Sequence, residues 1–134
     1  MKVHGACHCG AIGLEAEVDP ERVTICHCTD CQSLTGTAYR VSVPAPADSF
    51  LLTRGRPKIY VKVGDSGNRR VQAFCADCGS PLYTHADEAH PRSYGLRVGG
   101  LAERRQLTPR KRIWCRSALD WSTDLHGMLE LDRE

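Results

Sequence analysis

Apolar and polar residues alternate along most of this chain, and a period of two is typical of strands with one buried face. The clearest runs predict strands over residues 11–18, 38–43, 50–53, 58–63 and 69–74. Shorter runs predict further strands over residues 23–25, 81–84, 94–98 and 112–115. Helical periodicity is weak, and it predicts only single turns at residues 30–34 and 46–49.

Proline, glycine and asparagine separate these runs and predict where the strands end. A turn is expected at residues 19–22, and Pro44 is expected to end the strand that begins at Ala38. Gly64 and Gly67 predict a hairpin that joins residues 58–63 to residues 69–74. Many short antiparallel strands of this kind predict a mainly β sandwich or open barrel. The length of 134 residues predicts a single domain over residues 1–134.

Charge and hydropathy narrow the functional classes. The net charge is only +2, which gives no electrostatic footprint for nucleic acid. A local basic cluster is expected to be solvated rather than to bind nucleic acid; it consists of Arg104, Arg105, Arg110, Lys111 and Arg112. No apolar stretch approaches the roughly 18 residues that a membrane span requires. The sequence therefore predicts neither a nucleic-acid partner nor a membrane one.

The spacing of the cysteines is the strongest indication of function in this sequence. Seven of the eight fall into three groups, which are Cys7 with Cys9, then Cys26, Cys28 and Cys31, then Cys75 with Cys78. Cysteines one or two residues apart bridge poorly to each other, but they are well placed to bind one ion from one turn. The first residues contain no apolar run as long as a signal peptide. We therefore expect metal-bound thiols in the cytoplasm rather than a secreted disulfide framework.

Seven ligands divide into four and three, which are the numbers that a closed structural zinc site and an open catalytic zinc site use. Glycine follows the second cysteine of each pair, at Gly10 and Gly79, whereas Gln32 follows the triplet. Glycine permits a tight knuckle turn, and we expect its amide to point at a thiolate sulfur. The predicted structural zinc ligands are Cys7, Cys9, Cys75 and Cys78, and the predicted ligands of the open, catalytic ion are Cys26, Cys28 and Cys31.

An open site with three thiolates favours a soft substrate ligand. A thiol that coordinates zinc loses its proton, and the thiolate is the nucleophile of thiol chemistry. Three anionic ligands also weaken the ion as a Lewis acid, which disfavours amide hydrolysis. The sequence therefore predicts addition of a thiol to a carbonyl, or cleavage of such an adduct.

Three segments resemble a known family. Cys7-His8-Cys9-Gly10, Cys26-His27-Cys28-Thr29-Asp30-Cys31-Gln32 and Phe74-Cys75-Ala76-Asp77-Cys78-Gly79 are similar to motifs of the glutathione-dependent formaldehyde-activating enzymes, a domain that also occurs in centromere protein V. The resemblance implies an Mss4-like zinc-bearing β fold. It also implies a carbon–sulfur lyase that forms or cleaves S-hydroxymethylglutathione from glutathione and formaldehyde, with the same two sets of zinc ligands. The chain departs from many members at Gly100-Leu101-Ala102-Glu103 and at Cys115.

Other side chains are weaker candidates. His8 and His27 alternate with ligands and are expected to point away from the metal. Asp30 is expected to cap the short helical turn. Glutathione has two carboxylates, so an arginine near the site would help to bind it; the candidates are Arg40, Arg54, Arg69 and Arg70.

Two alternative functions stay open at this point. In a binding module with two structural zinc ions, His85 or Cys115 would complete the triplet. Cys115 also lies in a segment that faintly resembles the nucleophile region of B-type methionine sulfoxide reductases, although an isolated cysteine is more often buried in a core. Trp114 and Trp121 are expected to pack in or beside that core. Exposed strand edges make a homodimer the expected assembly.

Overall fold

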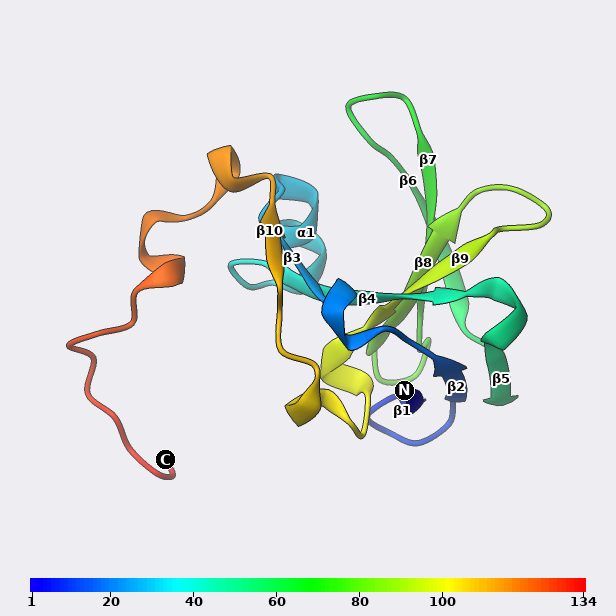
Figure 1. Ribbon diagram of the computed structural model, residues 1–134, viewed down its shortest axis with the longest axis horizontal. Coiled ribbons are helices and arrows are strands. Elements are labelled where there is room, and N and C mark those ends of the chain that lie inside the picture. Colours follow the sequence, from blue (N-terminus) through cyan, green and yellow to red (C-terminus); the bar gives the residue numbers. More distant parts are fainter.

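The computed structural model describes residues 1–134, and its ten strands form two sheets (Figure 1). A three-stranded sheet has the order β1-β2-β5, and a seven-stranded sheet has the order β10-β3-β4-β9-β8-β7-β6. Every pair is antiparallel except β10–β3, which is parallel. The strands are β1 (Lys2–Ala6), β2 (Gly13–Glu17), β3 (Thr24–Cys26), β4 (Arg40–Pro46), β5 (Leu51–Arg54), β6 (Lys58–Val63), β7 (Arg69–Phe74), β8 (Pro81–Ala86), β9 (Ser93–Arg97) and β10 (Lys111–Ile113).

Helical structure is sparse. The one α-helix is α1 (Thr29–Thr35), and short 3₁₀ turns are η1 (Pro20–Arg22), η2 (Ala47–Ser49), η3 (Val98–Gly100), η4 (Arg104–Gln106), η5 (Cys115–Ser117) and η6 (Asp120–Thr123). This mainly β architecture with cysteine clusters is of the Mss4-like type, as expected. None of these helices is long and apolar enough to cross a membrane.

The predicted hairpin is confirmed, because β6 and β7 pair in the register Lys58↔Phe74 to Val63↔Arg69. The expected end of a strand at Pro44 is wrong, since β4 continues to Pro46. The neighbour β3 begins at Thr24, opposite Ser42, so the side of β4 that would need the N–H of Pro44 has no partner strand there. The other side of β4 goes on pairing with β9 through Pro44↔Gly95 and Pro46↔Ser93.

Strand β1 was not predicted, because only Val3 marks a buried face within Lys2–Ala6. It exists through its pairing with β2, in which Val3 lies opposite Ala16 and Gly5 opposite Leu14. A Cβ atom at Gly5 would lie 2.9 Å from Leu14 Cδ1, so glycine lets this side chain pack over the strand. The pairing is a tertiary effect that a five-residue pattern cannot reveal.

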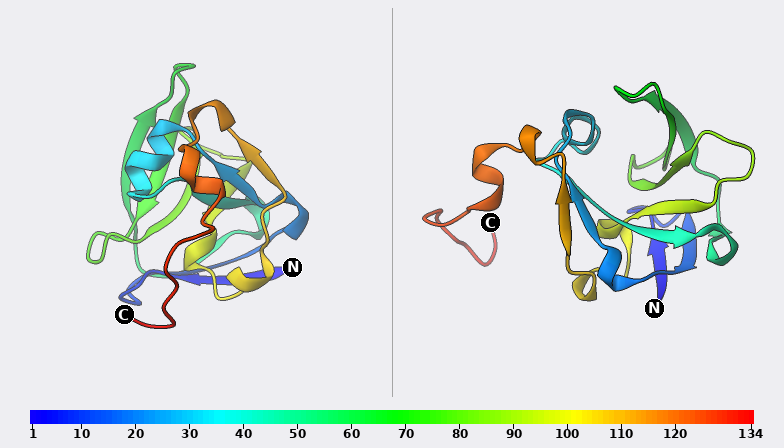
Figure 2. Two further views of the ribbon diagram at one scale, coloured as in Figure 1. Left: turned by 90° about the vertical axis from the view of Figure 1, so that its left-hand side faces the viewer. Right: turned by 45° about the horizontal axis from the view of Figure 1, so that its top comes forward.

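The two faces of the large sheet differ in polarity. Val43, Leu96 and Ala73 are buried on one face, where they form the core together with Val3 and Leu14 of the small sheet. Residues of opposite parity, such as Ser42 and Gln72, line a cleft on the other face. The small sheet therefore covers one face of the large sheet and leaves the other free (Figures 1 and 2).

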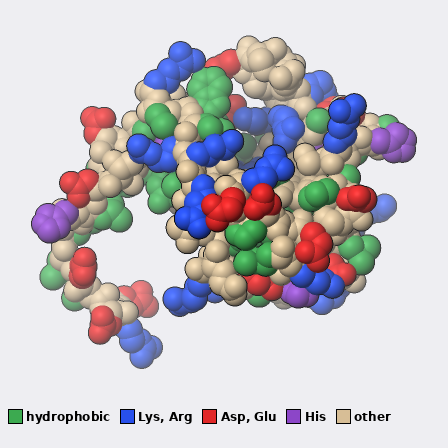
Figure 3. Space-filling view, viewed as in Figure 1, with side chains coloured by type: hydrophobic (Ala, Val, Ile, Leu, Met, Phe, Trp, Pro, Cys, Tyr) green, Lys and Arg blue, Asp and Glu red, His purple; other side chains and the backbone are tan.

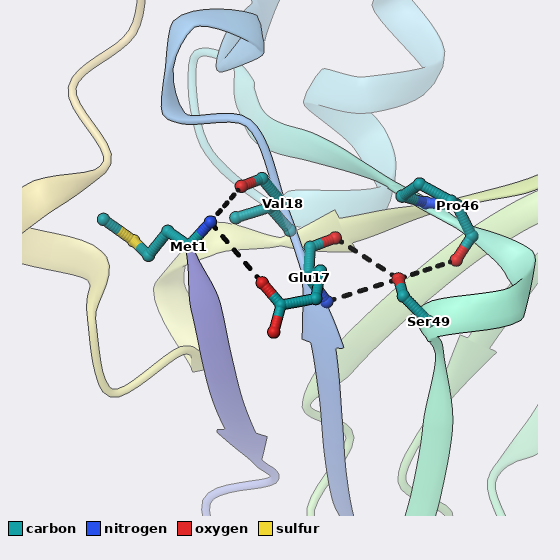
Figure 4. Close-up of polar contacts among 5 residues, drawn as sticks. All are labelled: Met1, Glu17, Val18, Pro46 and Ser49. Atoms are coloured by element: carbon teal, nitrogen blue, oxygen red, sulfur yellow. Dashed lines mark hydrogen bonds and ion pairs between the residues drawn. The ribbon is translucent and has the colours of Figure 1, made fainter.

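Polar contacts fix the start of the small sheet (Figure 4). The terminal ammonium of Met1 donates to the Val18 carbonyl at 2.8 Å and lies 3.6 Å from the Glu17 carboxylate. The backbone N–H of Glu17 donates to Ser49 Oγ at 3.2 Å, and this hydroxyl in turn donates to the Pro46 carbonyl at 2.9 Å. The small sheet is thereby attached to η2 and to the end of β4.

A second attachment predicts a pH effect on stability. Burial opposes ionisation of Glu103, but the ring of His4, 2.8 Å from Glu103 Oε1, and the backbone N–H of His4 outweigh burial and lower the pKa of the carboxyl below its ordinary 4.5. Because the pKa is lower in the folded state, the stabilisation is present above about pH 5 and is lost as the pH falls through the folded value. We expect Glu103→Gln to reduce the free energy of unfolding by less than ~1 kcal/mol at pH 7. The difference should shrink as the pH falls from 7 to about 3, because protonation of the carboxyl removes its advantage over the amide.

Thermal unfolding at the two pH values measures this effect. Glu88→Gln, at an exposed carboxylate without an ion pair, is the matched control and should change neither value. An effect of Glu103→Gln that is equal at both pH values would contradict an origin in the ionised carboxylate.

Candidate metal centres and adjoining cleft

Four cysteines from two distant parts of the chain meet beside the small sheet. The Sγ atoms of Cys7, Cys9, Cys75 and Cys78 all lie within 4.8 Å of one another. Cys7 and Cys9 follow β1, whereas Cys75 and Cys78 lie in the turn between β7 and β8. The predicted grouping of the two glycine-flanked pairs is therefore the grouping that the fold creates.

The backbone of the two knuckle turns has the conformation that glycine at these positions predicts. Gly10 and Gly79 adopt φ values of 80° and 75°, in the left-handed region that favours glycine. The expected target of their amides is wrong, because Gly10 N–H donates to the Cys7 carbonyl and Gly79 N–H to the Cys75 carbonyl. It is Ile12 N–H that donates to Cys7 Sγ, at 3.2 Å.

The spacing of the sulfur atoms fits a tetrahedral metal rather than a disulfide. Cys9 Sγ lies 3.6 Å from Cys7 Sγ and 3.7 Å from Cys75 Sγ. A zinc–sulfur bond of about 2.3 Å gives a tetrahedron with edges of about 3.8 Å, whereas a disulfide bond is about 2.05 Å long. All eight cysteines are free thiols. The donor set therefore suits a soft or borderline ion such as zinc.

The triplet forms a second, separate group. The Sγ atoms of Cys26, Cys28 and Cys31 lie within 4.8 Å of one another, and no fourth Cys, His, Asp or Glu joins them. Cys26 ends β3 and Cys28 is the N-cap of α1, where its Sγ accepts the N–H of Cys31 at 3.3 Å. Asp30 is therefore not the cap that the sequence suggested; it lies in the first turn and pairs with Lys62 at 3.0 Å.

A buried arginine contacts the triplet. Arg40 lies opposite Cys26 in the β3–β4 register and is buried. The pKa of Cys31 is lowered to about 5, chiefly because Cys26 donates a hydrogen bond to its sulfur, and the guanidinium of Arg40 adds to the effect. The same hydrogen bond raises the pKa of Cys26, so this end of the sheet favours a single negative charge, carried by Cys31.

The triplet borders a cleft of about 370 Å³ on the free face of the large sheet. Cys26 and Cys31 lie in its wall, and five cationic side chains line it: Arg40, Lys62, Arg70, Arg97 and Lys111. No aspartate or glutamate is among the lining residues. In Figure 3, Lys and Arg side chains gather around the hollow between the α1–β10 side of the molecule and the β6–β7 hairpin. The cleft is therefore suited to an anionic ligand.

Arg97 is the most constrained of these cations, and sequence reasoning did not single it out. Its guanidinium donates to Ser42 Oγ at 2.8 Å and to Gln72 Oε1 at 2.7 Å, while Nε is buried without a partner. Burial lowers its pKa to about 9, so the side chain is still cationic at neutral pH. Arg40 Nε is likewise buried and unpartnered. The only early signal was the position of Arg97 in a predicted strand, which does not distinguish it from other arginines.

Of the four arginines that the sequence suggested for carboxylate binding, two line the cleft. Arg40 and Arg70 do so. Arg69 points the other way from its neighbour Arg70 and donates to Asp87 at 2.8 Å. Arg54 donates to the Gly10 carbonyl at 2.8 Å, near the four-cysteine group.

The positions of two histidines, of the isolated Cys115 and of the two tryptophans differ in part from what the sequence predicts. His27 belongs to neither cysteine group, as expected of a side chain that points away from the metal, but it is fully buried with both ring nitrogens unpartnered rather than on the surface. Cys115 is exposed rather than in the core, and it does not line the cleft. His85 packs among Tyr83 and Tyr94. Neither His85 nor Cys115 joins the triplet, so neither is placed as the fourth ligand that the alternative binding module would use. Trp114 and Trp121, which were expected in the core or at its edge, are exposed, so neither packs in the core.

Comparison with known proteins finds a solved structure of similar fold. The chain resembles a crystal structure of a Rhodobacter sphaeroides protein, with a TM-score of 0.63 and 24% sequence identity over 84% of this chain and 99% of the other. That likeness shows the fold. Among proteins with curated annotation, none matches the sequence.

The fold and the two cysteine groups define a class of small β proteins that could hold two metal ions through thiolates. Within that class, the model of one family, described as glutathione-dependent formaldehyde-activating enzyme, matches residues 2–117. The chain belongs to the glutathione-dependent formaldehyde-activating enzyme family.

Proposed function

We propose that this protein is a carbon–sulfur lyase that acts on thiol–aldehyde adducts of the S-hydroxymethylglutathione type, with glutathione and formaldehyde as the thiol and the aldehyde. The observation that carries the proposal is the three-sulfur group of Cys26, Cys28 and Cys31 in the wall of a cleft that five cations line. Family membership supports the same activity.

We assign different roles to the two cysteine groups. Cys7, Cys9, Cys75 and Cys78 would hold a structural zinc ion that joins the start of the chain to the β7–β8 turn. Cys26, Cys28 and Cys31 would hold a catalytic zinc ion, which when bound favours the thiolate form of a substrate thiol. Free thiols of this kind suit a reducing compartment, and we propose the cytoplasm. We further propose that residues 1–134 act as one domain.

The residues of the cleft bind and orient the substrate. Glutathione carries two carboxylates, and guanidinium groups recognise carboxylates through paired N–H donors. Arg97 is held by Ser42 and Gln72, and it is therefore preorganised for such a contact. The lining cations bind the carboxylates of the ligand. The carbon–sulfur bond of the adduct would then lie toward Cys26 and Cys31.

The proposed reaction balances without an external oxidant or reductant. The carbon–sulfur bond of the adduct breaks, and the electron pair leaves with sulfur as a thiolate. The hydroxyl oxygen forms the carbonyl double bond of the aldehyde, and its proton goes to solvent. Because no carboxylate lines the cleft, water is the proton acceptor that we assign. Adduct formation is the same sequence in reverse.

Neighbouring arginines on β7 provide a matched test of the cleft. Arg70 lines it, whereas Arg69 points away and pairs with Asp87. We expect Arg70→Gln to raise KM for the glutathione adduct about tenfold, since a hydrogen bond to a charged group contributes roughly 1.5 kcal/mol. Adducts of an uncharged thiol such as 2-mercaptoethanol should show no change, and Arg69→Gln should behave like the natural chain with both thiols.

Exchange between free and adduct-bound formaldehyde, followed by NMR at equilibrium, measures the rate in both directions. A rate with the protein that equals the rate without it, for glutathione and for other thiols alike, would sink the proposed activity. An equal effect of Arg70→Gln on charged and uncharged thiols would instead leave the activity standing and remove the role of the cleft in carboxylate binding.

A further inference from the structure

The last 16 residues of the chain form an arm that makes no polar contact with the rest of the molecule. Residues 119–134 share no hydrogen bond or ion pair with residues 1–118. After η6 ends at Thr123 the arm has no regular element. In Figures 1 and 2 it leaves the body beyond β10 and extends away from both sheets.

The arm carries more apolar surface than an isolated extended segment normally exposes. Five large hydrophobic side chains lie on it, all more than half exposed: Trp121, Leu125, Met128, Leu129 and Leu131. Leu129 is 87% exposed and Leu131 is 70% exposed. A cluster of this kind marks an interaction site rather than a solvated tail.

Charge divides sharply between the arm and the body. Residues 119–134 contain five acidic side chains and one basic one, a net charge of −4, so residues 1–118 carry +6 and the whole chain +2. Figure 3 shows the arm with Asp and Glu side chains next to hydrophobic ones. The arm is therefore complementary to a basic surface that also offers apolar contacts.

Strand β6 provides a surface of that description. It is an edge strand of the large sheet, so one row of its backbone N–H and C=O groups has no strand partner. Ile59, Tyr60 and Val63 are exposed along it, and Lys58 is exposed at its start. A groove of about 380 Å³ that Ile59, Tyr60, Phe74 and Lys58 help to line runs beside the strand.

We propose that the arm of one molecule adds as a strand to the β6 edge of a second copy of the chain. As a strand, residues 125–132 would place Leu125, Leu129 and Leu131 on one face and Glu130 and Asp132 on the other. On β6, Ile59 and Val63 lie on one face and Lys58 on the other. Apolar and oppositely charged residues can therefore pair across the new strand boundary.

A second copy fits better than the arm's own β6. The arm leaves from the β10 side, and β10 is the edge of the large sheet opposite to β6. In the structure the arm turns outward, and Leu129 and Leu131 in its last part are left largely uncovered by their own chain. Reciprocal exchange between two copies uses the contact twice and closes with two-fold symmetry, which leaves neither β6 edge free. This inference does not depend on the proposed enzymatic function.

Light scattering coupled to size-exclusion chromatography tests the proposal on the full chain. We expect the natural protein to elute with twice the 14.8 kDa mass of one chain. The arm variant Leu129→Asp/Leu131→Asp and the edge variant Ile59→Lys should each be monomeric with unchanged circular dichroism. Leu51→Lys, at a similarly exposed residue on edge strand β5, is the matched control and should stay dimeric.

Mixing the two monomeric variants distinguishes exchange from other interfaces. The intact arm of Ile59→Lys and the intact edge of the arm variant can still form one contact, so the mixture should contain a heterodimer weaker than the natural dimer. A natural chain that is monomeric at all concentrations would overturn the proposal, and this includes an arm that folds back on its own molecule. A dimer that both variants leave intact would overturn it equally.

Discussion

Replacing Cys28 with serine is expected to remove one of two zinc ions and the lyase activity while leaving the fold intact. Cys28 belongs to the three-sulfur group, which lies apart from the four-cysteine group. Its second role is to cap α1, where its Sγ accepts the N–H of Cys31. Serine is a strong N-cap residue, so this substitution keeps the cap and removes the soft ligand.

The expected loss of activity is at least about 100-fold, because even substitutions beyond the ligands themselves typically cost 10–100-fold at metal sites. Metal analysis of protein purified without chelator should show two zinc ions in the natural chain and one in Cys28→Ser. Cys115→Ser, at an exposed cysteine outside both groups, should keep two ions and full activity. Two ions in Cys28→Ser, or one ion in the natural chain, would contradict the proposed catalytic site.

Replacing Cys75 with serine is expected to have the opposite character and to prevent stable folding. Cys75 is buried in the main core and its Sγ lies 3.7 Å from Cys9 Sγ, so it connects the β7–β8 turn to the residues after β1. Structural zinc contributes roughly 10–16 kcal/mol of binding free energy in small domains. That is comparable to, or larger than, the roughly 5–15 kcal/mol by which a typical domain is stable.

Thermal unfolding and near-UV circular dichroism measure this second effect. Cys75→Ser should lack a cooperative transition or remain insoluble, whereas Cys28→Ser unfolds near the temperature of the natural chain. A strong chelator should reproduce the Cys75→Ser behaviour in the natural protein once the metal is removed. A cooperative Cys75→Ser variant with an unchanged transition temperature would show that the four-cysteine group does not support the fold.

The two substitutions together separate the roles of the two groups. If Cys28→Ser loses activity and keeps its fold, the metal at the three-cysteine group has a catalytic role. If Cys75→Ser loses its fold, the metal at the four-cysteine group has a structural role. If both variants behaved alike, the division of seven cysteines into four and three would carry no functional meaning.

Much of this protein follows from its sequence because the relevant signals are local. Cysteines two or three positions apart lie in one turn wherever that turn is placed, so Cys26, Cys28 and Cys31 form a group in the structure as in the sequence. The β6–β7 hairpin is determined by alternation and by the glycines between its strands. The same local motifs carry the resemblance to the family that matches residues 2–117.

Other features depend on which strands become neighbours. The pairing of Gly5 with Leu14 creates β1, and the short reach of β3 allows β4 to continue through Pro44. The exposed positions of Cys115 and Trp114 follow from where β10 lies at the edge of the sheet. None of these depends on a pattern within a single segment, so sequence reasoning gave the wrong expectation or none.

The cleft is the clearest case of a feature that only the tertiary structure decided. Its five cations come from β4, β6, β7, β9 and β10, and the strand order alone brings them to one face beside Cys26 and Cys31. Arg69 and Arg70 are adjacent in the sequence, yet one pairs with Asp87 and the other lines the cleft. Alternation predicts that they point in opposite directions, but register and sheet packing determine which direction leads to the site. The sequence by itself determined the local groups of thiols that could hold metal ions, and the long-range pairing of strands determined the surroundings of those groups.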